Sequence, residues 1–178
     1  MKYYKKYISL TLLLLIFSCT PSSKSAKKPD DDFYEKSRKL VLSENKINQE
    51  YHFSIIGKEI DEIHIKYIGN IINSKKDTLK IINSQNLFGL LEESKRGNGS
   101  VYIYDNKNQL IGIYYLADYW AIPLKIENQS LVFSYDNYFC NQTTKISLRD
   151  SIPKKIFIQC TKGGGNLYNF KPANEITN

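Results

Sequence analysis

Histidine and cysteine are scarce in this chain of 178 residues, which contains two histidines and three cysteines. The histidines, His52 and His64, have no Cys-x-x-Cys or His-x-x-x-His spacing to support a metal site. No Gly-x-Ser-x-Gly or His-Glu-x-x-His segment occurs either. His64 lies between Glu62 and Lys66, where an exposed strand histidine is a commoner explanation than acid–base catalysis. We therefore predict no catalytic residue, no metal and no cofactor.

A dense basic segment is also missing, although the chain is basic as a whole. It has 25 Lys and Arg against 18 Asp and Glu, a net charge of +7. Three of the lysines lie within residues 1–18, and residues 47–178 contain 15 basic and 13 acidic residues. A surface that follows a nucleic-acid backbone needs clustered Lys and Arg interleaved with aromatic residues. We therefore expect no nucleic-acid partner.

The chain has no hydrophobic run long enough to cross a bilayer. Its main apolar segment, residues 7–17, follows Lys2, Lys5 and Lys6. A spanning helix needs about 20 apolar residues, whereas the hydrophobic part of a secretory signal needs about 7–15. Residues 1–18 are therefore predicted to be a signal peptide.

The end of this signal reads Ile16-Phe17-Ser18-Cys19 and resembles the lipobox of bacterial lipoproteins. The resemblance implies cleavage before Cys19, acylation of its thiol and amine with chains such as palmitate, and anchoring to a membrane through that lipid. Thr20 is not the Asp associated with inner-membrane retention, so the outer membrane is the expected destination. An ordinary secretory signal with a chance cysteine is the alternative.

Residues 19–32 are rich in Ser, Pro, Lys and Asp, a composition that predicts a flexible tether. Asp30, Asp31 and Asp32 resemble the acidic export signals of some surface lipoproteins of Bacteroidota, so the periplasmic and the cell-surface face of the membrane both stay open. Residues 33–172 are expected to form a single β-rich domain, followed by a flexible tail at 173–178.

Alternating apolar and polar residues predict mostly strands from residue 47 onward. We expect strands within residues 47–55, 63–67, 79–81, 101–104, 110–116, 131–135, 145–148 and 155–160, with turns at 73–76, 105–108 and 127–130. One short helix is expected within 32–42 and another at 84–96, where Leu87, Leu90 and Leu91 share a helical face. Residues from 163 onward have no clear pattern. The predicted fold class is mainly β or α+β: an antiparallel curled sheet or partly open barrel of about seven to nine short strands, with the 84–96 helix packed against it.

Two cysteines remain when Cys19 is assigned to the lipid, namely Cys140 and Cys160. An exported chain enters an oxidising compartment, where two such cysteines are expected to pair. Cys160 follows the alternation of Ile156 and Ile158, so its side chain points toward an apolar layer. We predict a structural disulfide between Cys140 and Cys160.

The most aromatic part of the mature chain contains Tyr115, Tyr119, Trp120 and Tyr138. Aromatic side chains of this kind are found both in cores and at partner surfaces, and both explanations stay open. With no catalytic spacing present, we predict a lipid-anchored module that binds an envelope protein or polymer through these residues. The alternative is an envelope hydrolase, or an inhibitor of an envelope or host enzyme.

Overall fold

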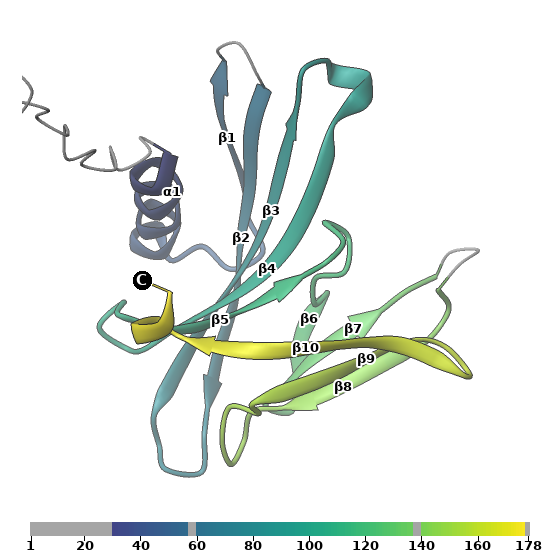
Figure 1. Ribbon diagram of the computed structural model, residues 1–178. Coiled ribbons are helices and arrows are strands. Elements are labelled where there is room, and N and C mark those ends of the chain that lie inside the picture. The colour runs from purple at the N-terminus through teal and green to yellow at the C-terminus, as the bar shows by residue number, and fades with distance from the viewer. Residues whose placement is uncertain (1–29, 57–59, 137–139, 177–178) are drawn as a thin grey trace, which may run out of the picture. The chain divides into compact units, whose positions relative to one another are not determined.

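A computed structural model describes residues 30–56, 60–136 and 140–176, shown as coloured ribbon in Figure 1. From Asp32 onward these residues belong to one compact unit. The elements are α1 (Asp30–Glu44), β1 (Glu50–Ile56), β2 (Ile60–Ile72), β3 (Thr78–Gly89), the 3₁₀ turn η1 (Glu92–Ser94), β4 (Arg96–Tyr104), β5 (Leu110–Leu116), β6 (Lys125–Glu127), β7 (Ser130–Ser134), β8 (Thr143–Ser147), β9 (Lys155–Thr161), β10 (Gly164–Pro172) and η2 (Ala173–Glu175).

Seven strands form an antiparallel sheet in the order β1-β2-β3-β4-β5-β10-β9, and β6-β7-β8 form a second antiparallel sheet. Strands β1 to β5 follow one another as a meander, and β10 lies between β5 and β9 (Figure 1). Strands β1 and β9 are the edges of the large sheet, so the described strands form a mainly β fold with no closed barrel.

Both faces of the large sheet are buried over its middle. In β4, Val101 and Ile103 pack into a core shared with the small sheet, whereas Tyr102 and Tyr104 pack into a second core beneath α1. Successive side chains of a strand point to opposite faces, so a strand covered on both sides needs a continuous apolar run. This requirement explains the unbroken Val101-Tyr102-Ile103-Tyr104 segment.

A bulge in β2 changes which side chains face which core. Ile65 and Tyr67 belong to the core beneath α1, whereas Ile68 and Ile71 belong to the core beneath the small sheet. The register against β3 shifts between Tyr67 and Gly69, and Gly69 has a φ of +125°. Only glycine adopts this backbone conformation without strain.

Helix α1 confirms the helix predicted within residues 32–42, with bounds of Asp30 and Glu44. It therefore includes the last residues assigned above to the tether. Val41 and Leu42 of this helix are fully buried against the sheet, and each such side chain stabilises the fold by about 1.5–3 kcal/mol. The guanidinium of Arg38 lies 4.1 Å from the centroid of the Tyr102 ring, a cation–π contact that helps to orient the helix.

The helix predicted at residues 84–96 is wrong, since β3 continues to Gly89 and β4 begins at Arg96. The segment pairs on both sides, Gln85 with His64 of β2 and with Gly99 of β4. Ser84, the first residue of that predicted helix, is instead a fully buried strand residue. Hydrogen bonding to two neighbouring strands outweighs the local helical spacing of the leucines.

The prediction of an irregular segment from residue 163 onward is also wrong. The flexible tail predicted at 173–178 is wrong as well for residues 173–176, which the structure describes. Strand β10 occupies Gly164–Pro172, and η2 follows at Ala173–Glu175. Phe170 pairs with Tyr114 of β5, and its ring leaves no room for a side chain at Gly112, where a Cβ would come within 2.3 Å of it. Residue Ile176 then packs against the core beneath α1. Strand β10 forms a hairpin with β9, but its other partner, β5, is more than fifty positions away, and local sequence does not reveal that second pairing.

The three predicted turns are confirmed as hairpin connections between β2 and β3, β4 and β5, and β6 and β7. Asn108 and Asn128 adopt positive φ values of 61° and 47°, as turn asparagines commonly do. In the β4–β5 turn, the Asp105 carboxylate accepts hydrogen bonds from the backbone N–H groups of Lys107 and Gln109.

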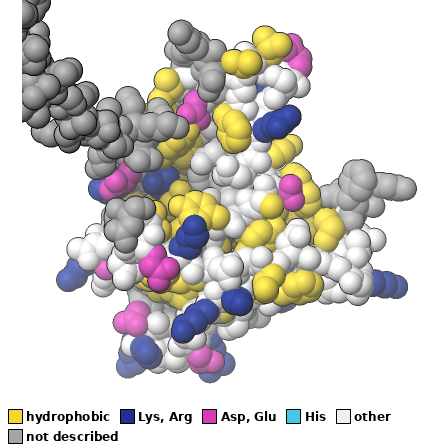
Figure 2. Space-filling model, viewed as in Figure 1, with side chains coloured by type: hydrophobic (Ala, Val, Ile, Leu, Met, Phe, Trp, Pro, Cys, Tyr) yellow, Lys and Arg dark blue, Asp and Glu magenta, His cyan; other side chains and the backbone are white. Residues whose placement is uncertain are grey.

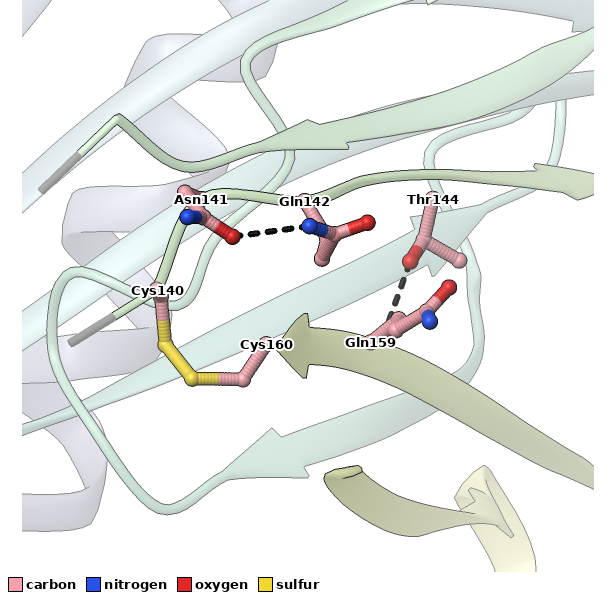
Figure 3. Close-up of a disulfide and its surroundings, with 6 residues drawn as sticks. All are labelled: Cys140, Asn141, Gln142, Thr144, Gln159 and Cys160. Atoms are coloured by element: carbon pink, nitrogen blue, oxygen red, sulfur yellow. Dashed lines mark hydrogen bonds between the residues drawn. A yellow bond between two sulfur atoms is a disulfide. The ribbon is translucent and has the colours of Figure 1, made fainter. Parts of the chain in front are cut away.

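The predicted disulfide between Cys140 and Cys160 is present, with 4.4 Å between the two Cα atoms (Figure 3). Cys140 lies in the segment between β7 and β8, and Cys160 is near the end of β9. The backbone N–H of Asn141 donates to the carbonyl of Cys160, and that of Gln159 donates to the Thr144 hydroxyl. The disulfide therefore links the segment between β7 and β8 of the small sheet to β9, an edge strand of the large sheet.

We predict that Cys140→Ser lowers the free energy of unfolding by about 3 kcal/mol in the chain-entropy account, because the closed loop spans a sequence separation of 20. For a domain of this size the melting temperature then falls by about 10 °C. Thermal unfolding followed by circular dichroism measures the change. Wild-type protein in reductant should melt like the variant, and a melting temperature that neither treatment alters would contradict the prediction.

Candidate functional site

The structure separates the aromatic residues that were predicted to form one surface. Tyr115 follows the buried Tyr114 on β5 and points to the face that carries α1, where the Lys171 ammonium lies 5.1 Å from its ring centroid. Tyr119 and Trp120 lie after β5, on the face that carries the small sheet. There the Trp120 ring meets the Tyr135 ring edge-on, with 5.2 Å between centroids. Tyr138 and Cys19 lie outside the described residues.

Tyr119 and Trp120 belong to residues 117–124, which cross β3 and β4 and are here called the strap. The Asn83 amide donates to the Pro123 carbonyl at 2.6 Å, and the Gln85 amide donates to the Tyr119 carbonyl at 2.9 Å. The crossing requires glycine at position 99 of β4, because a Cβ there would come within 2.8 Å of the Asp118 carbonyl oxygen. The sheet therefore holds the strap, and with it both exposed aromatic side chains, in one position.

We predict that Asn83→Ala lowers the free energy of unfolding by about 1–3 kcal/mol, because it leaves the buried Pro123 carbonyl without its donor. Gln85→Ala is the matched control: its bond to the strap is exposed, and its loss should cost at most about 1 kcal/mol. Urea unfolding measures both values. Equal stability of Asn83→Ala and wild type would show that the Asn83 bond does not hold the strap.

The hairpin formed by β3 and β4 ends in a group of exposed hydrophobic side chains, here called the apolar end. Phe88, Leu90 and Leu91 are exposed there, Leu90 at 70 % and Leu91 at 63 %. Figure 2 shows hydrophobic side chains at the top of the molecule, where Figure 1 places the end of this hairpin. The side chain of Leu87 and the Cβ of Tyr119 both lie within 3.0 Å of where a Cβ on Gly97 would be. The apolar end thus begins beside the strap.

A polar cluster lies on β1 and β2, on the sheet face that carries the strap. His52 and His64 are directly opposite each other across the two strands, and their rings stack with 3.9 Å between centroids and 6° between planes. The Glu50 Oε1 atom lies 3.0 Å from His52 Nε2 and 3.7 Å from His64 Nδ1. Lys66 Nζ lies 3.1 Å from Glu50 Oε2. These groups form one connected set of ionisable side chains.

Hydrogen bonds from lysines and burial set the ionisation of this cluster. The hydrogen bond from Lys66 is the main reason that the pKa of Glu50 is lowered, with a smaller effect of His52. The pKa of Glu62 is lowered chiefly by its hydrogen bond to Lys95, whose Nζ lies 2.7 Å from Glu62 Oε2. Burial lowers the pKa of His64, and the charge of His52 lowers it further. Both carboxyl groups are therefore ionised, and the His64 imidazole is neutral, at pH 7.

The residues around His64 predict an exposed strand position for it, but nothing in its own segment indicates that His52 lies beside it. The expectation of no metal rested on spacing within one segment, whereas Glu50, His52 and His64 come from two strands joined by cross-strand pairing. Their donor atoms lie within 4.8 Å of one another. A signal was available: both histidines occupy polar positions of alternating segments, so antiparallel pairing of those segments places them on the same face.

A hollow of about 550 Å³ lies between the turns at 73–78, 105–107 and 150–152. Its polar groups already serve the turns: the Asn73 side chain accepts hydrogen bonds from the N–H groups of Lys75 and Asp77, and Asp105 closes the β4–β5 turn. Both lysines and aspartates line the hollow, so it has no single charge to select a ligand. It is a weaker candidate than the apolar end or the histidine cluster.

The Cys140–Cys160 disulfide indicates an extracytoplasmic location, because disulfides persist in oxidising compartments and are rare in the cytoplasm. In the part of the chain that the structure describes, no helix has both the length and the apolar character needed to cross a membrane. Comparison of the chain with family models, curated proteins and solved structures found no match.

Proposed function

We propose that this protein is a lipid-anchored interaction module of the outer membrane, facing the periplasm or the cell surface, with no catalytic activity of its own. The lipid is carried by Cys19 of the Ile16-Phe17-Ser18-Cys19 segment, and several acyl chains at about 0.8 kcal/mol per buried methylene hold the protein firmly. The extracytoplasmic disulfide supports export, which this anchoring requires.

We expect Cys19→Ser to abolish acylation and to move the protein from the membrane fraction to the soluble fraction of the envelope, since the thiol carries the anchor. Metabolic labelling with an alkyne fatty acid and detergent phase partition measure the two effects. Cys160→Ser is the control, because it removes a cysteine without touching the anchor and should leave labelling unchanged. An unaltered membrane fraction for Cys19→Ser would refute the lipid anchor.

The observation that carries the proposed binding function is the apolar end of the β3–β4 hairpin. Leu90 and Leu91 are largely exposed to solvent, although burying such a side chain gains about 1.5–3 kcal/mol. Exposed apolar groups gathered at one place mark protein–protein contact sites. We propose that Leu90 and Leu91 enter an apolar depression on a partner protein of the envelope, and that Tyr119 and Trp120 on the strap contact it beside them.

A second candidate function is inhibition of an envelope or host enzyme. The observation that favours it is the same hairpin end, since a pair of exposed leucines after β3 presents a narrow apolar element that fits an enzyme cleft. The hydrolase alternative has less support, because the His52 side chain is 61 % exposed on the edge strand β1, although His64 beside it is 21 % exposed. The identity of the partner separates binding from inhibition.

We predict that Leu91→Ser weakens binding of the partner about tenfold or more, which corresponds to about 1.4 kcal/mol. Site-specific photo-crosslinking from position 91 in intact cells identifies the partner, and isothermal calorimetry with the purified partner measures its affinity. Leu167→Ser on β10 is the matched control, since Leu167 is 58 % exposed and lies on the opposite part of the sheet.

Equal affinities of the wild type, Leu91→Ser and Leu167→Ser would refute the hairpin end as the binding surface. A Tyr119→Ala/Trp120→Ala variant tests the strap separately, and unchanged affinity would remove the strap from the interface. If the partner is an enzyme, its turnover in the presence of the wild type and of Leu91→Ser decides whether binding is inhibitory.

A further inference from the structure

Both histidines of the chain occupy one site, formed by facing positions of β1 and β2. The Glu50 carboxylate lies beside both rings, since its Oε1 atom is within 3.7 Å of one nitrogen of each imidazole. Two imidazoles and one carboxylate are the ligand set that zinc and neighbouring transition metals bind. This cluster lies on other strands than Leu90 and Leu91 and is unexplained by the proposed function.

We propose that Glu50, His52 and His64 form a binding site for a divalent transition-metal ion of the zinc class. His52 contributes Nε2, His64 contributes Nδ1 and Glu50 contributes Oε1, which already lies 3.0 Å from the first nitrogen and 3.7 Å from the second. A three-ligand set leaves one tetrahedral position for water or for a group of a partner.

The supporting contacts resemble those that orient metal ligands in proteins. The other nitrogen of His64, Nε2, lies 3.9 Å from Glu62 Oε2, and Lys95 holds that carboxylate at 2.7 Å. A carboxylate that hydrogen-bonds a ligating imidazole fixes the ring and its tautomer; at 3.9 Å, Glu62 is an ion-pair neighbour of His64 and lies just beyond hydrogen-bond distance. The second oxygen of Glu50 is bound by Lys66, which leaves Oε1 directed toward the two rings.

The backbone supplies the rigidity that such a site needs. His52 and His64 are paired residues of an antiparallel ladder, and β2 is paired along its other side with β3. Their separation is therefore fixed by strand geometry rather than by a loop. The stacked rings need to tilt toward each other so that both lone pairs meet one ion about 2.0–2.1 Å away; the exposed His52 side chain has room to do so.

The charges around the cluster are balanced, because each of its two carboxylates has a lysine beside it. Lys66 and Lys95 offset the charges of Glu50 and Glu62. This balance limits the attraction of the cluster for a cation and leaves selection to the two imidazoles, which disfavours Ca²⁺ and Mg²⁺.

Calorimetric titration with Zn²⁺ tests the site, using untagged protein that carries Cys19→Ser, which removes the one cysteine outside the disulfide. We expect one Zn²⁺ per chain, affinity at least tenfold lower in His52→Ala and in His64→Ala, and no heat with Mg²⁺. Electron paramagnetic resonance of the Cu²⁺-loaded protein should show coupling to imidazole nitrogen, which is lost when both histidines are replaced.

Glu127→Gln is the matched control for Glu50→Gln, because Glu127 is an exposed strand carboxylate that also binds a lysine, with Lys145 Nζ 2.8 Å away, but has no histidine beside it. Glu50→Gln should weaken Zn²⁺ binding and Glu127→Gln should not. Circular dichroism verifies that each variant is folded. No Zn²⁺ binding by folded wild type, or binding that both histidine replacements leave unchanged, would overturn the proposal, whatever the outcome for Leu91→Ser.

Discussion

The long antiparallel pairing of β2 with β3 is the interaction on which the rest of the structure depends. It runs from Ile60 opposite Gly89 to Ile72 opposite Thr78, with one shift at the bulge before Gly69. On one side β2 carries β1 and the histidine cluster, and on the other side β3 carries β4 and the bonds to the strap. Slippage by one residue would reverse the faces of all these side chains. The register therefore positions every candidate site at once.

The same hairpin extends beyond the layers that cover it. Over its middle the sheet has α1 on one face and the small sheet on the other, and the side chains there are buried. Toward Gly89 the cover ends, so Leu90 and Leu91 are exposed after β3 and the polar cluster of β1 and β2 reaches solvent. Side chains without a covering layer contribute little to the core. They are available for a partner or a ligand, which is why both proposals concern this end of the sheet.

Local patterns predicted the elements whose stabilising contacts are close in sequence. The hairpin turns follow from Asn and Asp at positions such as Asp105 and Asn108, whose side chains and backbone preferences act within a few residues. Local patterns gave wrong predictions for elements whose stabilising partners are distant in the sequence. Leu87, Leu90 and Leu91 have helical spacing, but residues 84–89 pair with β2 and β4, and β10 pairs with the distant β5 as well as with the neighbouring β9. The aromatic residues near position 119 were assigned to one surface, yet alternation along β5 sends Tyr115 to the opposite face.

The sequence by itself determined the mainly β composition of the domain, its hairpin turns and the pairing of Cys140 with Cys160. Alternation, turn residues and the number of cysteines are properties of the chain itself, and they do not depend on how the strands are arranged in space. Only the tertiary structure decided that His52 faces His64 beside Glu50, that Leu90 and Leu91 lie uncovered, and that the strap crosses β3 and β4. These relations depend on register and on which layer covers which strand, and both are set by contacts between segments far apart in the chain.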